Sequence, residues 1–295
     1  MSTASHKPAT AEGLDWNSRE IDELLERALA EDIGPGDVTT AAVLPEAVEA
    51  TGTFLAKASL VVAGLPLLQR LYALLDPGIR FQTIAEEGAL VARGPLAVAR
   101  GDARALLRGE RTALNFLQRL SGIATLTRRF ALRLEGTKAR LLDTRKTTPG
   151  LRVLERYAVR AGGGANHRFG LFDAILIKEN HAELAGGVGA AVRRARRQAA
   201  GQRIEVEARE VAEVRDALDA GADAVLLDNM SVHDVRHAVS LAAGRVPLEV
   251  SGGITLENIR DYAEAGVDFI SVGALTHSAP AADISFEVFA GEPRV

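Results

Sequence analysis

The chain has 295 residues, 47% hydrophobic and 25% charged, with a formal net charge of −4 and no cysteine. This composition excludes a disordered or collagen-like protein. The absence of cysteine excludes disulfide bonds, cysteine metal ligands and a cysteine nucleophile. A length near 300 residues favours one large or two moderate domains. No apolar run is long enough for a membrane span, and the polar N-terminus lacks a signal-peptide core, so we expect a cytoplasmic protein. The mildly acidic balance gives no electrostatic reason to bind nucleic acid.

The sequence divides into two regions that differ in their pattern of helix-like and strand-like segments. Residues 1–13 read as a disordered tail, and residues 14–122 mix helical periodicity with short strand-like runs, which predicts an α+β domain. Residues 123–278 alternate regularly between strand-like and helix-like segments. We expect residues 279–295 to return to the first domain.

The first region begins with an amphipathic helix. Asn17 and Glu20 have the spacing of a capping box, and the helix is expected to end at Gly34. Short strand-like runs bounded by Gly or Pro follow between residues 51 and 100, with a short helix predicted over 65–75.

A long helical pattern leads into the second region. Asp102 is expected to cap it, and the pattern pauses at Gly122 before resuming to Leu134. Six apolar runs then follow at nearly constant spacing, each separated from the next by one helix: 139–143, 174–178, 203–207, 224–228, 247–251 and 269–273. Such runs are typical of parallel βα units. The spacing, and the lack of a GxGxxG turn after the first run, favour an incomplete α/β barrel over a doubly wound sheet.

Polar or glycine-rich turns follow all six runs. In a barrel these turns converge at the carboxyl ends of the strands, where such enzymes hold their active sites. A single charged residue at a strand end is most often a solvated loop residue, but six turns of this kind predict a site. They are Asp143-Thr144-Arg145-Lys146, Lys178-Glu179-Asn180-His181, Glu205 with Glu207, Asp228-Asn229, Ser251-Gly252-Gly253 and Gly273-Ala274.

The last two turns are rich in glycine. Ser251-Gly252-Gly253 and Gly273-Ala274 could let backbone N–H groups close on an anion, and the last two loops of barrels commonly bind phosphate. A tight turn without a ligand is the alternative for either one taken alone. The pair favours a phosphate site.

A cationic group is expected opposite these turns. It comprises Arg145, Lys146, His167, Arg168 and Lys178, and only five lysines occur in the whole chain. The planar guanidinium group of Arg can donate two hydrogen bonds to one carboxylate or phosphate, while the ammonium group of Lys offers a compact point charge. Solvation at the surface is the alternative, and it is weakest for Lys178, which directly follows an apolar run.

Two acidic residues complete the predicted site. Glu207 and Asp228 could bind sugar hydroxyls or a Mg²⁺ ion that itself holds phosphates, or they could simply hydrogen-bond neighbouring loops. The residues therefore predict a phosphorylated substrate together with a carboxylated one. Glycosyl transfer from a sugar diphosphate and Schiff-base aldol chemistry at a lysine both remain open.

At these same positions the sequence resembles the decarboxylating quinolinate phosphoribosyltransferases, also called nicotinate-nucleotide pyrophosphorylases. The resemblance covers the chain from about residue 14 and is carried by EDIGPGDVTT (31–40), GERTALNFLQRLSGIAT (109–125), LLDTRKTTPGLR (141–152), GGGANHRFGLFDAILIKENH (162–181), IEVEA (204–208), LLDNM (226–230), SGGI (251–254) and ISVGALTHS (270–278). One departure is Ala208-Arg209, where a second Val and then Glu are expected.

The resemblance implies a fold and an assembly. It implies an N-terminal α+β open-faced sandwich and an incomplete α/β barrel of about six to seven parallel strands, in a homodimer whose site takes Arg111 from the partner subunit. The substrate-binding residues it implies are Arg111, Thr144, Arg145, Lys146, His167, Arg168, Lys178, Glu207, Asp228, Ser251, Gly252, Gly253, Gly273 and Ala274. Lys146, Lys178, Glu207 and Asp228 would be catalytic, and Glu207 and Asp228 would face Mg²⁺.

The implied reaction joins quinolinate to phosphoribosyl pyrophosphate, giving nicotinate mononucleotide, pyrophosphate and CO₂ for NAD biosynthesis. Three alternatives stay open: a paralogue on the same scaffold with a different substrate, a Schiff-base lyase using Lys178, and a non-catalytic metabolite sensor.

Overall fold

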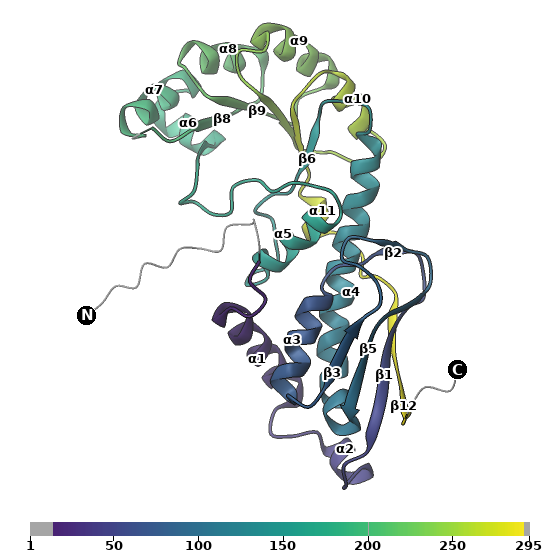
Figure 1. The fold of residues 1–295 in the computed structure, drawn as a ribbon. Helices are drawn as coiled ribbons and strands as arrows, with labels where there is room; N and C mark the ends of the chain where they lie inside the picture. The colour runs from purple at the N-terminus through teal and green to yellow at the C-terminus, as the bar shows by residue number, and fades with distance from the viewer. Residues whose placement is uncertain (1–13, 200, 292–295) are drawn as a thin grey trace, which may run out of the picture. The chain divides into compact units, whose positions relative to one another are not determined.

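The computed structural model describes residues 14–199 and 201–291, so the predicted tail at residues 1–13 lies outside the described part. The chain forms two compact units (Figure 1). The first runs to Leu126 and includes Pro149–Gly163 and the segment from Ala279 onward, and the second comprises Thr127–Thr148 and Gly164–Ser278.

One segment differs from the sequence-based division, which placed residues 149–163 in the barrel region. The structure groups them with the first unit. The helix α5 (Arg152–Ala161) carries Glu155, which is fully buried and accepts hydrogen bonds from Arg119 of the first unit at 2.8 and 3.0 Å. A buried carboxylate needs such a partner, and this pairing explains why the segment belongs with the first unit.

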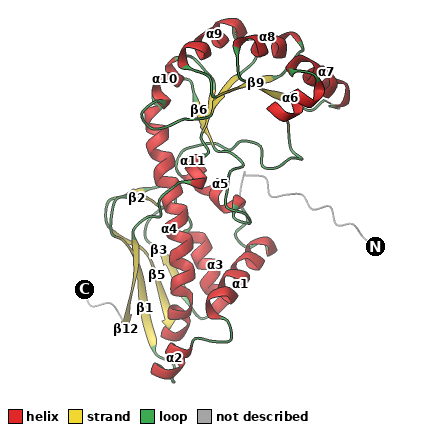
Figure 2. Ribbon diagram, turned by 180° about the vertical axis from the view of Figure 1, so that it is seen from behind, coloured by secondary structure: helices red, strands yellow, loops and turns green. Residues whose placement is uncertain are grey.

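The first unit is built around a four-stranded antiparallel sheet in the order β12-β1-β5-β3. Figure 2 shows helices on one face of this sheet, as in the predicted open-faced sandwich. Tyr72 of a helix and Phe54, Phe81 and Phe286 of three strands form its aromatic core, with ring centroids 4.4 to 6.4 Å apart. The strands are β1 (Glu49–Ala56), β3 (Arg80–Thr83), β5 (Gly94–Asp102) and β12 (Ile284–Ala290), with β2 (Leu60–Val61) and β4 (Leu90–Val91) forming a separate pair.

The helices of this unit are α1 (Arg19–Ile33), α2 (Val38–Val43), α3 (Leu65–Leu75), α5 and most of α4 (Ala103–Arg133). The helix predicted over 65–75 is confirmed. The predicted cap of α1 was wrong by one residue, because Ser18 rather than Asn17 is the N-cap, its Oγ accepting the Ile21 N–H at 3.4 Å.

The predicted pause at Gly122 was also wrong. The helix α4 is continuous through this residue. A Cβ at position 122 would lie 2.0 Å from the carbonyl oxygen of Pro280, so the glycine serves the close approach of the returning C-terminal segment rather than a break in the helix.

The second unit is an incomplete α/β barrel. Its six strands are all parallel, as the sequence predicted, and they run in the order β6-β11-β10-β9-β8-β7. The strands are β6 (Arg140–Leu142), β7 (Ile175–Ile177), β8 (Ile204–Ala208), β9 (Ala224–Asp228), β10 (Leu248–Ser251) and β11 (Phe269–Ser271). Figure 1 shows helices over the outer side of the sheet, namely α7 (Val188–Gln198), α8 (Val211–Asp219), α9 (Val232–Ala242) and α10 (Ile259–Glu264). The unit also contains the short helices α6 (Glu179–Ala185) and α11 (Ala274–His277).

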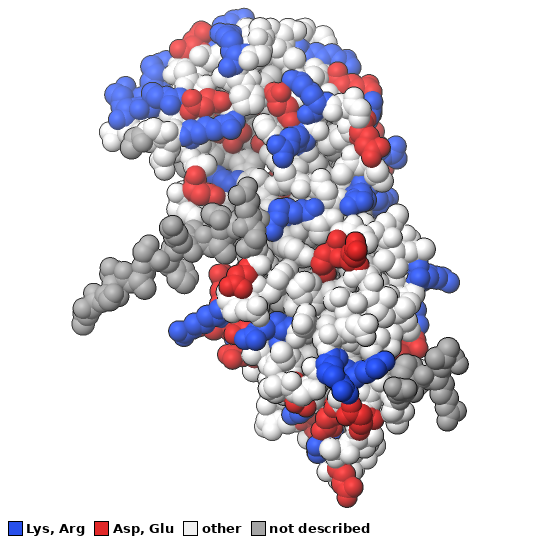
Figure 3. All heavy atoms as spheres, viewed as in Figure 1, with Lys and Arg blue, Asp and Glu red and all other residues white. Residues whose placement is uncertain are grey.

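The surface carries both signs of charge. On the face shown in Figure 3, Lys and Arg atoms are interspersed with Asp and Glu atoms over both units. None of the helices in the described ranges is both long and apolar enough to cross a membrane.

Candidate active site

A cavity of about 590 Å³ lies in the second unit, where the strands of the barrel end. Its walls include most of the residues that the sequence singled out. The lining residues are Thr144, Arg145, Lys146, His167, Arg168, Leu176, Lys178, Glu207, Leu226, Asp228, Asn229, Glu249, Ser251, Gly252, Gly253 and Ser271. The carboxyl ends of parallel strands meet at one edge, which explains how turns far apart in sequence reach one cavity.

Three of the substrate-binding residues that the resemblance implies do not line this cavity. Arg111 is exposed on α4, in the part of that helix that belongs to the first unit. Gly273 and Ala274 follow β11, and Gly273 packs against a lining residue, since a Cβ there would lie 3.0 Å from Cδ of Lys146.

Asp143 organises the cationic wall. It is fully buried just after β6, and its carboxylate accepts the backbone N–H of His167 at 2.8 Å and the side-chain amide of Asn166 at 2.6 Å. The bridge between Leu142 and Ala165 holds the same segment against the strand. Asp143 therefore fixes the loop that presents His167 and Arg168 to the cavity.

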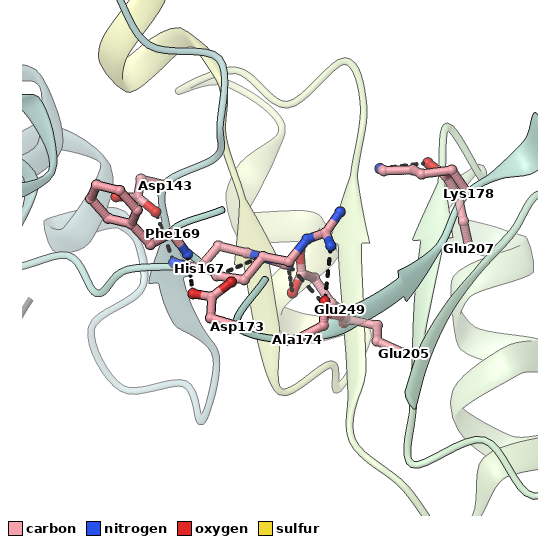
Figure 4. Close-up of polar contacts among 10 residues, drawn as sticks. Asp143, His167, Phe169, Asp173, Ala174, Lys178, Glu205, Glu207 and Glu249 are labelled. Atoms are coloured by element: carbon pink, nitrogen blue, oxygen red, sulfur yellow. Dashed lines mark hydrogen bonds and ion pairs between the residues drawn. The ribbon is translucent and has the colours of Figure 1, made fainter. Parts of the chain in front are cut away.

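His167 lies between two carboxyl groups. Its Nε2 is 3.5 Å from Glu205 of β8 and 3.5 Å from Glu249 of β10 (Figure 4). Its Nδ1 accepts the backbone N–H of Arg168 at 2.7 Å, so the ring proton lies on Nε2, facing the two acids. Burial opposes a charged ring, but the hydrogen bond to Glu205 and the charges of Glu249, Glu205 and Asp143 raise the pKa of His167.

Glu249 is buried, with 3% of its surface exposed. Burial raises the pKa of this carboxyl to about 7, while the neighbouring His167 acts in the opposite direction. Its Oε1 has no hydrogen-bond partner among the described residues. Glu249 is therefore a buried carboxyl of raised pKa in the lining of the cavity.

The two arginines of the wall repel each other. Burial and the charge of Arg145 lower the pKa of Arg168, whose guanidinium also donates to the carbonyl of Ala174 at 2.9 Å. An anion placed between Arg145 and Arg168 would relieve this repulsion, and a guanidinium suits a carboxylate or phosphate geometrically.

Lys178 lines the same cavity and is paired with an acid. Its Nζ is 3.1 Å from Glu207, whose second carboxylate oxygen accepts the backbone N–H of Glu179 at 3.1 Å (Figure 4). The departure from the family pattern, at Ala208-Arg209, directly follows Glu207 and lies outside the Lys178–Glu207 ion pair. Ala208 is buried in β8, and Arg209 forms an ion pair with the side chain of Glu179.

Asp228 ends β9, which pairs with the strand β8 that carries Glu207, and both residues line the cavity. Burial and the charge of Glu207 raise the pKa of Asp228, against a hydrogen bond from Asn229 at 2.8 Å. Two crowded carboxylates of this kind suit a divalent cation, which prefers oxygen ligands.

The glycine turn after β10 is shaped by a close contact. Gly252 has a φ of +90°, and a Cβ there would lie 2.2 Å from Oδ1 of Asn229. The backbone N–H of Asn229, itself at a φ of 55°, donates to the carbonyl of Ser251 at 2.9 Å. Only glycine fits at position 252, and the two turns are locked together.

Four lining residues were missed by sequence reasoning, namely Leu176, Leu226, Glu249 and Ser271, whereas Asn229 belongs to one of the predicted turns. Glu249 had a signal that could have found it, because a charged residue inside a buried apolar strand is rare without a special partner. The group His167, Glu205 and Glu249 also places one possible metal-ligand atom from each residue within 4.8 Å of the others.

Comparison with known proteins identifies the family. A model of the quinolinate phosphoribosyl transferase N-terminal domain matches residues 37–121, and one of the C-terminal domain matches residues 123–287. The chain is 43% identical over 275 residues to a probable nicotinate-nucleotide pyrophosphorylase (carboxylating) of Bacillus subtilis, covering 92% of this chain and 94% of that protein. It is 39% identical to a mitochondrial quinolinate phosphoribosyltransferase (decarboxylating) of Nicotiana tabacum, over 91% of this chain and 82% of that one.

A solved structure agrees with these relatives. The nicotinate-nucleotide pyrophosphorylase from Francisella tularensis superposes with a TM-score of 0.90 at 40% identity, over 96% of this chain and 100% of that chain. The chain belongs to the quinolinate phosphoribosyltransferase family.

Proposed function

We propose that this protein transfers the phosphoribosyl group of phosphoribosyl pyrophosphate to quinolinate with loss of CO₂, giving nicotinate mononucleotide and pyrophosphate for NAD biosynthesis. Membership of the family supports the reaction. The observation that carries it in the structure is that one cavity of about 590 Å³ combines a cationic wall, two acids and a glycine turn. These match a dicarboxylate, a ribose with its pyrophosphate, and a 5-phosphate.

The dicarboxylate would bind at the cationic wall. Arg145 and Arg168 repel each other there, and Lys178 and His167 line the same cavity. Two ring carboxylates would offset this positive charge, and the planar guanidinium group suits a carboxylate geometrically. Arg111 of a partner subunit would complete the pocket in a homodimer, a role supported by its exposed position on α4.

The phosphoribosyl group would lie toward the opposite wall. Ser251, Gly252 and Gly253 line the cavity as a turn in which two residues carry no Cβ, and Gly273 with Ala274 follows the adjacent strand. Thr144 and Lys146 line the same cavity. Backbone groups of such turns bind phosphate oxygens well.

The acids fit a Mg²⁺ ion brought with the pyrophosphate. The raised pKa of Asp228 reflects burial and the charge of Glu207, so a nearby cation would stabilise both carboxylates. Both oxygens of Glu207 already accept hydrogen bonds, which favours Asp228 as a direct ligand and Glu207 as one acting through water. When bound, the ion would neutralise the leaving pyrophosphate.

The residues would then act by position and charge. As the bond from the ribose carbon to pyrophosphate breaks, the ring nitrogen of quinolinate forms a bond to that carbon, and Lys146 and Lys178 stabilise the developing negative charge. The nitrogen becomes cationic and can accept the electron pair left when the bond to CO₂ breaks, and a proton replaces the carboxylate. No side chain has to act as a nucleophile.

The direct test is an assay with quinolinate, phosphoribosyl pyrophosphate and Mg²⁺, in which nicotinate mononucleotide and CO₂ should form in equal amounts. Equal use of nicotinate would instead indicate a paralogue with another substrate. The Schiff-base alternative would require Lys178 to leave its ion pair with Glu207. Borohydride in the presence of substrate should therefore trap no adduct on Lys178.

The dimer has its own test. The variants R111A and R168A should each be nearly inactive, and mixing them should restore activity if each site takes Arg111 from the partner subunit. Failure to complement, with both variants folded, would remove Arg111 from the shared site.

A further inference from the structure

A second group of metal-ligand side chains lies outside the cavity, on helix α9 (Val232–Ala242). His233 and His237 are four residues apart, with ring centroids 4.4 Å apart. Together with Asp234, they bring one possible ligand atom from each residue within 4.8 Å of the others. None of the three is among the residues that line the candidate active site.

Helix geometry explains this arrangement. Residues four apart lie on the same face of a helix, one turn apart, so the backbone of α9 holds the two imidazoles side by side. A cation would therefore meet two ligands that need only rotamer adjustment. Such preorganisation reduces the entropy lost on binding.

Asp234 is held in place by its neighbour. Ser231 caps α9, accepting the backbone N–H of Asp234 at 3.2 Å, and its Oγ also lies 2.7 Å from the Asp234 carboxylate. The serine hydroxyl can donate to one carboxylate oxygen and leave the other available. Partners of this kind orient metal ligands and strengthen their binding.

The donor set selects the class of ion. Two imidazole nitrogens and one carboxylate oxygen suit Zn²⁺ and its neighbours Ni²⁺ and Cu²⁺, whereas Mg²⁺ prefers oxygen ligands and retains its water. Three protein ligands also leave one tetrahedral position for water or for a group of another molecule.

We propose that His233, Asp234 and His237 form a surface site for a divalent transition-metal ion of the Zn²⁺ class. The site is separate from the Mg²⁺ of the proposed reaction and does not depend on the proposed function. Both histidines are exposed, so the ion can enter without a change in the fold.

The test is calorimetric titration of the untagged, chelator-treated full chain with Zn²⁺ alone. The wild type should bind one more Zn²⁺ per chain than the double variant H233A/H237A. The single variant H237A should bind at that site roughly tenfold or more weakly, because a lost ligand costs at least as much as a lost supporting contact. R236A, an exposed substitution on the same helix, should leave binding unchanged.

A second readout uses stability. Zn²⁺ at micromolar concentration should raise the thermal unfolding midpoint of the wild type and of R236A, but not that of the double variant, because an ion bound to the folded state stabilises it. The exposed substitutions should leave the fold intact, which circular dichroism without metal checks. The proposal is wrong if H233A/H237A binds Zn²⁺ with the stoichiometry and affinity of the wild type, or if H6A, in the N-terminal segment, abolishes binding.

Discussion

Nε2 of His167 lies 3.5 Å from a carboxylate oxygen of Glu249, which comes from within the buried strand β10. The imidazole belongs to the loop that Asp143 holds against β6. The cationic wall of the candidate active site thus includes an acid whose pKa is raised by burial. This relationship makes the stability of the protein, and the charge of its site, sensitive to pH.

The first prediction concerns Glu249. Its pKa rises from 4.5 in the unfolded chain to about 7 in the fold, so its stabilising effect is complete below about pH 4.5 and is lost as the pH rises through 7. The raised pKa of His167 changes the free energy of unfolding in the same direction, since its stabilising contribution is also lost as the pH rises. The free energy of unfolding of the wild type should therefore fall between about pH 4.5 and 7 through these groups, and the E249Q variant should show a flatter profile.

Urea unfolding at pH 5.5 and pH 8.5 measures this difference. E183Q, a substitution of an exposed glutamate on α6, should retain the pH dependence of the wild type. Parallel profiles for E249Q and the wild type would show that Glu249 does not titrate as described.

The second prediction concerns Arg168. R168A should lower kcat/KM for quinolinate, because a carboxylate of the substrate loses its charged partner. The decrease should correspond to a loss of about 2–4 kcal/mol in transition-state stabilisation. The folded protein should not lose stability in proportion, since the repulsion by Arg145 disappears as well. Steady-state kinetics and urea unfolding separate these effects, with R197A on the exposed face of α7 as the control. Unchanged turnover of quinolinate by R168A would remove this residue from the site.

The third prediction separates stability from activity at Asp228. Burial and the charge of Glu207 raise its pKa, so its ionised form destabilises the fold at neutral pH. D228N should therefore be more stable than the wild type at pH 7.5, yet release pyrophosphate roughly 100-fold or more slowly, in line with the loss of a charge-stabilising group.

Asp223 provides the opposite control. Despite burial, hydrogen bonds from Ile204 and Arg196 lower the pKa of Asp223, so D223N should lose stability at neutral pH and retain activity. A D228N variant that is both less stable and fully active would contradict the proposed role of Asp228.

The fourth prediction concerns the glycine turn. G252A introduces a Cβ only 2.2 Å from Oδ1 of Asn229 at a φ of +90°, so the turn must shift. We expect a loss of about 1–3 kcal/mol in stability and a marked rise in KM for phosphoribosyl pyrophosphate. G221A has the same kind of backbone, with a φ of +82°, but no atom within 4 Å, and it should lose stability through strain alone without a change in KM. Equal KM values for the two variants would argue against phosphate binding at this turn.

The barrel strands were predictable because their residues are buried on both faces. The run at 224–228 coincides with β9, and the other five runs overlap the observed strands. Long-range packing was not visible in the sequence. At Gly122 the local pattern predicts a pause, whereas the approach of Pro280, far along the chain, explains the glycine within a continuous helix.

The same contrast between local sequence pattern and long-range packing applies to the candidate active site. Residues after strand ends, such as Lys178 and Asp228, could be placed because parallel strands end at one edge of the sheet. Glu249 was missed because it lies within a strand, where only the direction of its side chain brings it to His167. The proposed role of Arg111 depends on the proposed homodimer, and contacts between subunits are not visible in the pattern of one chain.

The most direct measurement of the central claim is a crystal structure of the protein with quinolinate bound. The account predicts the pyridine ring within the cavity that Arg145, Arg168 and Lys178 line, with both carboxylates in hydrogen-bonding distance of these cations and the ring nitrogen facing Asp228 and the Ser251–Gly253 turn. Quinolinate bound elsewhere, or with its carboxylates against the glycine turn and the cationic wall left without them, would contradict it.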